Sequence, residues 1–406
     1  MKIPLKIILK TMWRYSQEVF VIFYYKILSL FYKEKSKFKD AWLVCERGIE
    51  ARDNGFTFFK YVRENYPQKR IYYLIDSSHK KDYEKVKKLG DTIEYNSFEH
   101  KMALFFASHL ISTHIGFISK WSLVLFKKIF APRNQIFVLL NHGITKEDMS
   151  LMLNKLTTGV DLFIAATKND WETVALDKRY GYDKKDVALT GYARYDNWHS
   201  FLTKRQILFM PTWRKYLVKR NIYDKNNPNV TNDFTQSAYF QHLSNFLNNK
   251  ELHGLLEEHN LDLLFYPHYE VQKSLPLFKI ENSRIKIACR STHDIPTLLK
   301  ESLMLISDYS GVTFDFAYMK KPLIYYQFDQ QEYYSGHYLK GDFEMENDGL
   351  GVVVTCEKDL INEIKHYIMN GFEMEEKYTK RVDSTFTFHD NKNCERIYNA
   401  IINYKL

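Results

Sequence analysis

Residues 307–318 read Ser-Asp-Tyr-Ser-Gly-Val-Thr-Phe-Asp-Phe-Ala-Tyr, and this stretch decides the expected fold. The apolar runs at 303–306 and 323–326, on either side of it, have the length and composition of buried strands. Residues 312–319 follow a helical pattern that ends before Pro322. This order of strand, turn, helix and strand predicts a parallel sheet with helices packed against it.

The turn in this stretch also has a composition that suits phosphate binding. Asp308 and Ser310 are good helix caps, and Gly311 lets the backbone approach a ligand closely. A helix that begins here offers free N–H groups and the positive end of its dipole, both of which suit a phosphate group. An ordinary capped helix would have the same composition, so this stretch alone supports both interpretations.

Length and composition indicate a folded protein of two domains with anionic partners. The 406 residues suffice for two hydrophobic cores, and 45% hydrophobic with 26% charged residues is typical of globular proteins. The net charge of +9 favours acidic lipid, phosphorylated substrates or nucleic acid as partners. The four cysteines lie far apart without a C-x-x-C pair, which argues against a zinc site or disulfide framework and fits a reducing cytoplasm.

Residues 1–39 differ from the rest of the chain. Lysine and arginine recur at helical spacing among apolar residues, and the longest uncharged run, between Glu18 and Lys26, is far shorter than the roughly 20 residues of a spanning helix. We expect a basic amphipathic segment that lies on an anionic membrane surface; the alternative is a helix packed on the domain with a solvated basic face. The aromatic segment at 121–130 is expected to touch the membrane or to form a buried helix.

From residue 42 the chain alternates between strand and helix patterns, which predicts two Rossmann-like, doubly wound α/β domains. A polar stretch at 191–205 marks the boundary, so domains at 40–200 and 201–406 are expected, the second closed by C-terminal helices. Residues 218–237 are polar and Asn-rich and are expected to form a loop or lid. The predicted strands are 42–45, 70–75, 110–113, 136–140, 162–165 and 187–190, then 207–210, 263–266, 284–288, 303–306 and 323–326.

Four candidate sites directly follow predicted strands, at the edge where parallel sheets bind ligands. His142 and His268 each follow a strand of one half and sit beside Gly143 or Pro267 on a rigid loop, where a histidine can meet a substrate and titrate near neutral pH. The other two sites are Pro211-Thr212-Trp213-Arg214 and the 307–311 turn. A single histidine of this kind is more often structural, but this combination is more specific. The P-loop, dinucleotide-binding, zincin and G-x-S-x-G motifs are absent.

Together with Asp294-Ile295-Pro296 and the segments at 46–47 and 51–55, these motifs resemble the CDP-glycerol glycerophosphotransferase family of teichoic acid and capsule polyol-phosphate transferases. The resemblance covers roughly residues 42–326 and implies a GT-B fold with an interdomain cleft, peripheral at the cytoplasmic face of the cell membrane. It implies transfer of glycerol phosphate, or a related polyol phosphate, from CDP-glycerol or another CDP-polyol to a hydroxyl of a lipid-linked polyol-phosphate or glycan acceptor, with release of CMP. No cofactor is expected, and no compact acidic cluster demands a metal.

The resemblance also implies roles for individual residues. By position, the catalytic residues are His142 and His268, and the donor-binding residues are Arg214, Asp294, Asp308, Ser310 and Gly311. The chain departs from the family pattern in three places. Thr145 stands near where a proline is usual, tyrosines flank Pro267-His268, and Gly311 replaces a common second serine. These departures bear on the identity of the acceptor and of the polyol more than on the class of reaction.

The implied reaction is attack of an acceptor hydroxyl on the β-phosphorus of the donor, with His142 as the candidate base. His268, Arg214 and the helix start near Ser310 would hold the diphosphate. A nucleotide-sugar glycosyltransferase of the same architecture is an alternative, and so is a basic membrane-surface or nucleic-acid-binding module without chemistry. No recognised nucleic-acid motif occurs, so no nucleic-acid partner is expected. Glycerol versus ribitol and primase versus polymerase stay open.

Overall fold

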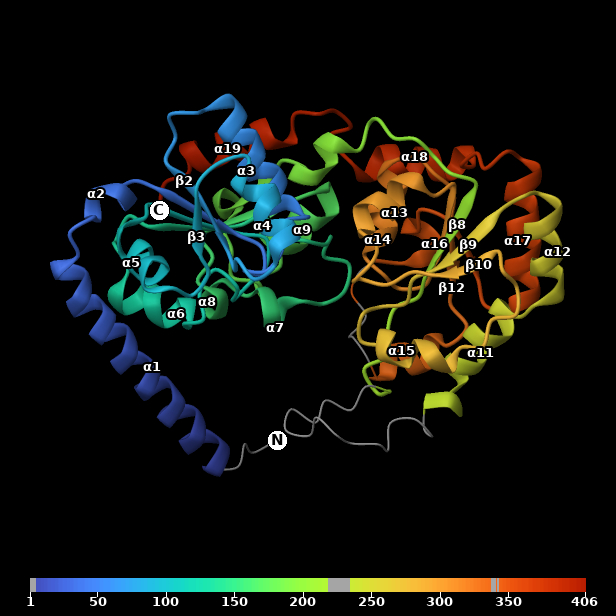
Figure 1. Ribbon diagram of the computed structural model, residues 1–406, viewed down its shortest axis with the longest axis horizontal. Coiled ribbons are helices and arrows are strands. Elements are labelled where there is room, and N and C mark those ends of the chain that lie inside the picture. Colours follow the sequence, from blue (N-terminus) through green and yellow to red (C-terminus); the bar gives the residue numbers. More distant parts are fainter. Residues whose placement is uncertain (1–4, 218–233, 337–340, 342) are drawn as a thin grey trace. The chain divides into compact units, whose positions relative to one another are not determined.

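The computed structural model describes residues 5–217, 234–336, 341 and 343–406 (Figure 1). The chain divides into two compact units. Unit 1 comprises Met1–Ile144, Met149–Asn197 and Asp390–Leu406, and unit 2 comprises Thr145–Asp148 and Trp198–His389. Each unit contains one wholly parallel sheet with helices packed against it, which confirms the predicted pair of α/β domains.

The sheet of unit 1 has seven strands in the order β3-β2-β1-β4-β5-β6-β7. The chain runs outward from β1 to β3 and then returns to place β4 on the other side of β1. The topological switch point, where doubly wound sheets bind ligands, therefore lies between the carboxyl ends of β1 and β4. The strands are β1 (Trp42–Cys45), β2 (Ile71–Ile75), β3 (Thr92–Glu94), β4 (His109–Ser112), β5 (Ile136–Leu139), β6 (Leu162–Ala165) and β7 (Val187–Leu189).

The sheet of unit 2 has six strands in the order β10-β9-β8-β11-β12-β13, with its switch point between β8 and β11. The stretch at 307–318 has the predicted form, because β11, helix α14 (Val312–Tyr318) and β12 follow one another as a parallel crossover. The strands are β8 (Gln206–Met210), β9 (Asp262–Phe265), β10 (Ile285–Ile287), β11 (Met304–Ser307), β12 (Leu323–Tyr326) and β13 (Val352–Val354).

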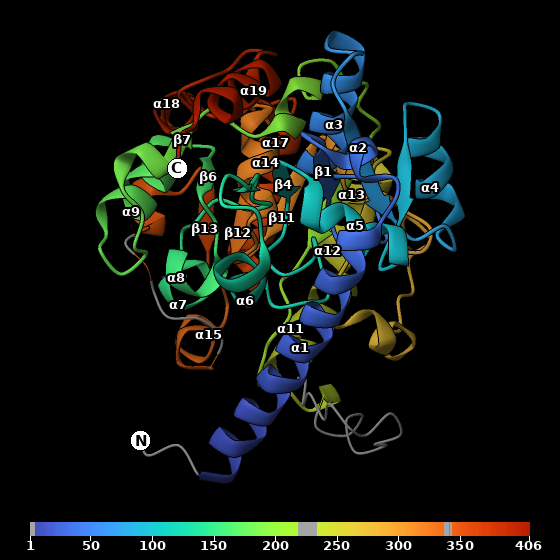
Figure 2. The same cartoon turned by 90° about the vertical axis from the view of Figure 1, so that its left-hand side faces the viewer.

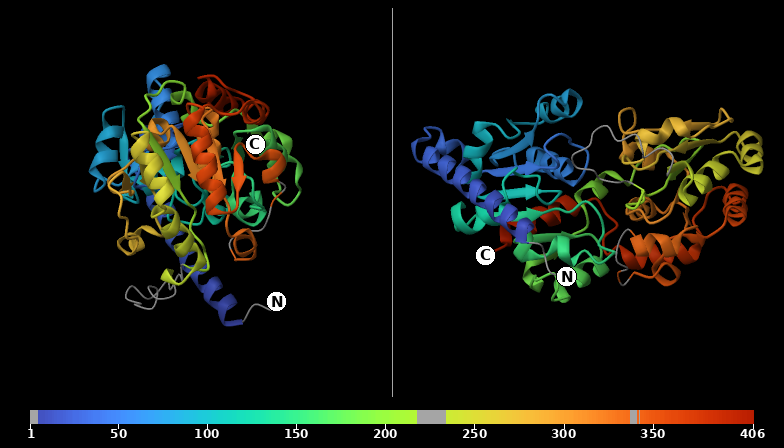
Figure 3. Two further views of the ribbon diagram at one scale, coloured as in Figure 1. Left: turned by 90° about the vertical axis from the view of Figure 1, so that its right-hand side faces the viewer. Right: turned by 90° about the horizontal axis from the view of Figure 1, so that it is seen from below.

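Helices cover both sheets. In unit 2, α12 and α17 lie on one face of the sheet and α13 and α14 on the other (Figure 3). The helices of unit 1 are α1 (Leu5–Phe31), α2 (Lys35–Phe38), α3 (Asn54–Asn65), α4 (Lys80–Lys87), α5 (Phe98–Phe106), α6 (Leu123–Leu125), η1 (Phe126–Phe130), α7 (Ser150–Leu153), α8 (Lys155–Thr158), α9 (Lys168–Leu176), η2 (Lys184–Asp186), η3 (Ala193–Asn197) and α19 (Asn393–Asn403). Those of unit 2 are α11 (Ala238–Leu247), α12 (Lys250–Glu258), η4 (Gln272–Leu277), α13 (Ile295–Glu301), α14, α15 (Gln330–Gly336), α16 (Met345–Asp348), α17 (Glu357–Met369) and α18 (Glu376–Thr385).

The central strands were predictable because parallel strands are buried on both faces and therefore form continuous apolar runs. All residues of β1, β2, β5, β6, β8, β11 and β12 are buried, and every predicted strand is present within one or two residues of its expected bounds. Strands β3 and β13 were not predicted. Both have three residues and lie at the edge of a sheet, and only one residue of each is buried.

The last helix belongs to unit 1, whereas the sequence analysis placed it with the C-terminal domain. The carboxylate of Asp196 accepts hydrogen bonds from the backbone N–H groups of Asn393 and Cys394, both at 2.8 Å, and so caps the start of α19. The ring of Tyr398 stacks on Tyr66 with centroids 3.9 Å apart. These partners lie far away along the chain, which is why the sequence did not reveal the return of the chain to unit 1.

The N-terminal segment is largely one helix, α1, whose N-terminal part extends away from the rest of unit 1 (Figure 2). Ile22 is fully buried, and Val19, Tyr25 and Leu28 pack against the core of unit 1. Large apolar side chains elsewhere on the helix are exposed, namely Trp13, Phe20, Phe23, Tyr24, Leu30 and Phe31. Among the described residues no helix is both long and apolar enough to cross a bilayer. The membrane role of this segment therefore stays a prediction.

The aromatic segment at 121–130 and the polar segment at 218–237 can be compared with their predictions. Residues 121–130 form α6 and η1, with Trp121, Phe126 and Phe130 buried and Ile129 56% exposed, which favours the buried alternative for most of the segment. The expected loop or lid at 218–237 falls mostly outside the described residues, which resume at Phe234.

Candidate functional site

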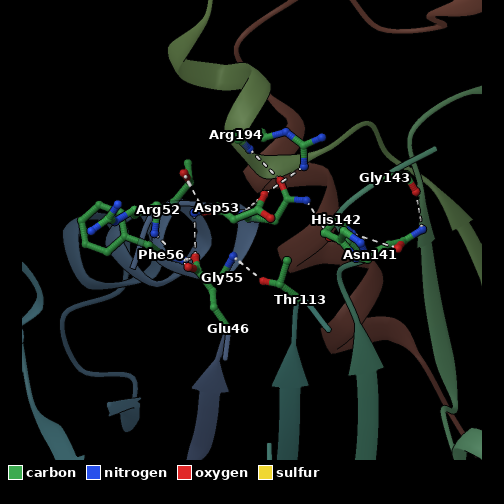
Figure 4. Close-up of polar contacts among 12 residues, drawn as sticks. Glu46, Arg52, Asp53, Gly55, Phe56, Thr113, Asn141, His142, Gly143 and Arg194 are labelled. Carbon is green, nitrogen blue, oxygen red and sulfur yellow. Dashed lines mark hydrogen bonds and ion pairs between the residues drawn. The ribbon is translucent and has the colours of Figure 1, made fainter. Parts of the chain in front are cut away.

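His142 lies at the carboxyl edge of the sheet of unit 1, directly after β5, and its side chain is exposed. The preceding residue, Asn141, has φ of 57°, a left-handed conformation that asparagine tolerates better than most residues. The side chain of Asn141 accepts a hydrogen bond from the His142 N–H at 2.8 Å and donates one to the Gly143 carbonyl at 2.9 Å (Figure 4). The backbone that carries His142 is therefore fixed locally.

Asn54 fixes this loop to two other loops of unit 1. Its fully buried side-chain amide donates to the Asn141 carbonyl at 2.7 Å and accepts from the Arg194 N–H at 3.0 Å. The next residue back, Asp53, forms an ion pair with Arg194 at 2.9 Å and caps α3. The loops after β1, β5 and β7 therefore form one rigid assembly at the switch point.

Glu46 organises the turn between β1 and α3. Its buried carboxylate accepts hydrogen bonds from the backbone N–H groups of Arg52, Asp53 and Phe56, each at 2.8 Å. Burial and the negative charge of Asp53 raise the pKa of Glu46, and these backbone donors oppose the rise. The glycine at 55 is required here, because a Cβ atom would lie 2.9 Å from both Glu46 and Thr113 (Figure 4).

The ring of His142 stacks on the ring of His114, which follows the neighbouring strand β4; the ring centroids are 4.3 Å apart with an interplanar angle of 17°. Partial desolvation lowers the pKa of His142 below its ordinary value. The negative charge of Asp53 and a hydrogen bond with the backbone of Thr113 oppose this shift, whereas Arg47 and Arg194 reinforce it. His142 is therefore neutral near pH 7 and able to accept a proton.

In unit 2, Arg214 is fully buried between two carboxylates. Its Nε and Nη2 atoms donate to both oxygens of Asp329 at 2.6 and 2.9 Å, and Nη2 lies 2.9 Å from Asp308. Its Nη1 donates to the Thr212 carbonyl at 2.7 Å. Four aromatic rings lie 4.9–5.8 Å from the guanidinium carbon, those of Tyr239, Tyr309, Phe328 and Tyr333. The Asp308 carboxylate also accepts the N–H groups of Thr212 and Tyr309, so this cluster joins the loops after β8, β11 and β12.

Ser310 and Gly311 lie at the start of α14 as predicted. Gly311 is exposed and adopts φ of −64°, and a Cβ atom at this position would meet no other atom within 4 Å. Ser310 is half-buried, and its hydroxyl accepts the Val312 N–H at 3.4 Å. The backbone at Gly311 is therefore open to solvent, and its conformation does not require glycine.

His268 follows β9 and is half-buried, and its ring packs against two aromatic rings. The ring centroid is 5.7 Å from that of Trp213 and 4.2 Å from that of Tyr269. Its Nδ1 accepts the Glu270 N–H at 3.3 Å, so in the neutral ring the proton resides on Nε2. The hydrogen-bond donor of the neutral His268 ring is therefore Nε2.

Asp294 caps helix α13: its carboxylate accepts from the Thr297 N–H at 3.3 Å and from the Thr297 hydroxyl at 2.9 Å. The loop after β10 is tied to the His268 loop through Gln272, which donates to the Pro267 carbonyl and accepts from the Arg290 N–H. In the described part of the chain, no group of three or more His, Cys, Asp or Glu residues is arranged to hold a metal ion.

The structure thus brings together Arg214, Asp308, Ser310, Gly311 and His268 at one edge of unit 2, with Asp294 one loop further along, and places His142 at the matching edge of unit 1. The stacking of His114 on His142 was not predicted from the sequence. His114 follows a predicted strand just as His142 does, and that shared position is the signal that could have found it.

Comparison with known proteins gives a consistent result. A model of the family described as CDP-glycerol:poly(glycerophosphate) glycerophosphotransferase matches residues 27–403. The minor teichoic acid biosynthesis protein GgaB of Bacillus subtilis is 33% identical over 371 residues, which cover 90% of this chain and 40% of that protein. A teichoic acid poly(glycerol phosphate) polymerase of Staphylococcus epidermidis is 24% identical, over 84% of this chain and 46% of the polymerase. The chain therefore spans less than half the length of these relatives.

A solved structure of the wall teichoic acid polymerase TagF has the same fold. Its TM-score is 0.65 at 18% sequence identity, and the match covers 97% of this chain and 96% of that one.

Proposed function

The chain belongs to the CDP-glycerol:poly(glycerophosphate) glycerophosphotransferase family, and we propose that it transfers glycerol phosphate, or a related polyol phosphate, from a CDP-polyol donor to a hydroxyl of a lipid-linked acceptor. CMP is the other product. The observation that carries the proposal is His142, an exposed imidazole on a rigid backbone at the switch point of unit 1.

His142 is the general base in this proposal. A hydrogen bond with the backbone of Thr113 occupies one side of the ring, so the other ring nitrogen can take the proton of the acceptor hydroxyl. The hydroxyl oxygen then forms a bond to the β-phosphorus of the donor, and the bond from that phosphorus to the bridging oxygen breaks. CMP leaves with the electron pair. A positioned base of this kind contributes roughly 10²–10⁴-fold to the rate.

The donor diphosphate is held by unit 2 in this proposal. The Nε2 N–H of His268, the Ser310 hydroxyl and the open backbone at Gly311 are donors at the edge of one sheet. Donors that are fixed before reaction stabilise the charge that develops on the phosphoryl and leaving groups. Arg214 and Asp308 support this site indirectly, because their buried side chains hold the loops that carry these donors. Asp294 caps α13 and so positions the loop after β10, and in this proposal it lies near the nucleotide of the donor.

The acceptor is lipid-linked in this proposal, so the protein acts at the cytoplasmic face of the membrane as a peripheral protein. Exposed apolar side chains of unit 1 support this location. They include Phe20 and Phe31 of α1, and Leu151, Met152 and Leu156 of α7 and α8. Such exposed apolar side chains suit a membrane surface, and the net charge of +9 favours an anionic one.

The experiment that tests the function is a donor screen with product detection. The purified chain is incubated with vesicles that contain a lipid-linked polyol-phosphate acceptor and with CDP-glycerol, CDP-ribitol or UDP-sugars. We expect release of CMP from a CDP-polyol and an acceptor whose mass increases by one polyol phosphate. Release of UDP from a UDP-sugar without CMP release would instead identify a glycosyltransferase.

A further inference from the structure

We propose that His114 and Arg47 are positioning residues that hold the ring of His142 in one orientation and keep a second proton away from it. This inference rests on the proposed function, since it gives His142 its role as base. The relevant groups all belong to unit 1 and lie at its switch point.

The sheet itself brings the two histidines together. Strands β4 and β5 are parallel neighbours, with Ser112 paired to Leu139. His114 and His142 follow these two strands by two and three residues, so their side chains leave the same edge of the sheet. Their rings lie almost parallel with centroids 4.3 Å apart, and stacking over a whole ring face limits the rotation of His142.

The His114 ring is itself held firmly. It is only 8% exposed, and the ring of Phe117 meets it edge-on with centroids 5.8 Å apart. The Ser112 hydroxyl donates to the His114 carbonyl at 2.7 Å and accepts from the His114 N–H at 3.3 Å, which fixes the backbone. Because the His114 ring is fixed by these contacts, it can restrict the orientation of the His142 ring that stacks on it.

Arg47 determines the protonation of His114. Its Nε–H donates to the Nε2 atom of His114 at 3.1 Å, and only an unprotonated ring nitrogen can accept this bond. The proton of the neutral ring therefore resides on Nδ1, which is buried and has no hydrogen-bond partner among the residues that the structure describes. A phenylalanine would fill the same space without an unpaired donor, so the distinctive contribution of His114 is an acceptor that anchors Arg47 together with the Glu50 carboxylate, which lies 3.3 Å from the same Nε atom.

The charges that face His142 explain why a neutral His114 is important for the base. They are Asp53 at the start of α3, Arg194 on η3, and Arg47 after β1, which is paired with Glu50; His114 after β4 is neutral, because burial lowers its pKa. Of these charges only Asp53 stabilises the imidazolium that forms when His142 takes a proton; the hydrogen bond with the Thr113 backbone adds to this, and the two arginines oppose it. A protonated His114 would add a third positive charge against the ring face and would block the base.

The test uses variants that separate stacking from anchoring. His114→Phe keeps a stacked ring but removes the acceptor, His114→Ala removes both, and Arg47→Met removes the anchored charge. His109→Phe is the matched control, because His109 lies at the opposite end of the same strand and packs against Trp42. Each variant is titrated by NMR of ¹³Cε1-labelled histidine, with the His142 signal assigned from a His142→Gln variant.

The variants are expected to differ in how far they raise the pKa of His142. The pKa of His142 should rise by about 0.5–1 unit in Arg47→Met, because a nearby positive charge is lost, and should rise most in His114→Ala, where solvent also reaches the ring face that His114 covers. His114→Phe should resemble Arg47→Met, and His109→Phe should resemble the wild type. In the CMP-release assay, kcat of His114→Ala should fall roughly 10–100-fold from misplacement of the base, with KM for the donor unchanged.

An unchanged His142 pKa in both His114→Ala and Arg47→Met would overturn the inference. Equal shifts in His114→Phe and His109→Phe would also overturn it, since His114 would then be an ordinary core residue. The titration needs no substrate, so it reads out this inference even if the wild type releases no CMP. An absence of CMP release by the wild type would refute the proposed function instead.

Discussion

Replacing Asp329 with alanine is expected to destabilise unit 2 strongly, because it removes one of the two carboxylates that neutralise Arg214. The guanidinium is fully buried, and Asp329 is 5% exposed. The substitution deletes two charge-assisted hydrogen bonds, at 2.6 and 2.9 Å, and leaves Arg214 with Asp308 alone. Asp308 does not replace these bonds, because its Oδ1 atom already accepts the N–H groups of Thr212 and Tyr309 and its Oδ2 atom already lies against Nη2 of Arg214.

The size of the effect follows from this geometry. Removing one partner of a buried ion pair costs about 3–5 kcal/mol, and the remaining Asp308 places the estimate at the lower end, about 3 kcal/mol. One kcal/mol shifts the melting temperature of a unit of this size by about 2–4 °C, so a decrease of about 6–12 °C is expected. The matched control is Asp383→Ala, which breaks the exposed ion pair with Lys320 and should change the stability by less than about 1 kcal/mol.

The assay is differential scanning calorimetry of the whole chain, with CDP-glycerol affinity measured in parallel at a temperature where each variant is folded. If Asp329→Ala has the same melting temperature as Asp383→Ala, the buried cluster does not hold unit 2 together. If it melts normally but loses donor affinity, Arg214 contacts the donor directly, and the supporting role given to it here is wrong.

Two further predictions concern the donor turn and the membrane. Gly311→Val should leave the melting temperature unchanged, because a Cβ atom there meets no neighbour, but should weaken CDP-glycerol binding by obstructing the backbone; Ser310→Ala should cost about 1.5–3 kcal/mol of donor binding. A large loss of stability without loss of donor affinity would contradict the phosphate-binding interpretation of this turn. The double variant Phe20→Ser/Phe31→Ser changes side chains that are 74% and 77% exposed, so it should lower binding to anionic vesicles without lowering the melting temperature. The control is Leu202→Ser, at an 89% exposed site in unit 2, and equal vesicle binding by all three proteins would exclude α1 as a membrane contact.

Much of the fold could be predicted from the sequence, because buried parallel strands are apolar along their whole length. The turn at 307–311 and the helix α14 were predictable for the same reason, since they connect two such runs. The short edge strands could not be predicted in this way, because Thr92–Glu94 has a single buried residue. The place of α19 depends on Asp196, and no local pattern indicates such a distant cap.

The positions of the candidate site residues were partly predictable. His142 and His268 were proposed because each follows an apolar run, and the structure places both at the carboxyl edges of their sheets. The burial of Arg214 could not be predicted, because its partner Asp329 follows a different strand, and only the order of strands in the sheet brings the two together. The stacking of His114 on His142 depends in the same way on the pairing of β4 with β5.

The most direct test of the central claim is the rate of CMP release by His142→Gln compared with the wild type, at saturating CDP-polyol and acceptor. The wild type should lose activity only as the pH falls below 6.5, because the pKa of His142 is lowered from that ordinary value and the base is active when unprotonated. His142→Gln should release CMP roughly 10²–10⁴-fold more slowly at every pH, with donor affinity unchanged by calorimetry. Turnover at the wild-type rate by His142→Gln would contradict the assignment of His142 as the base.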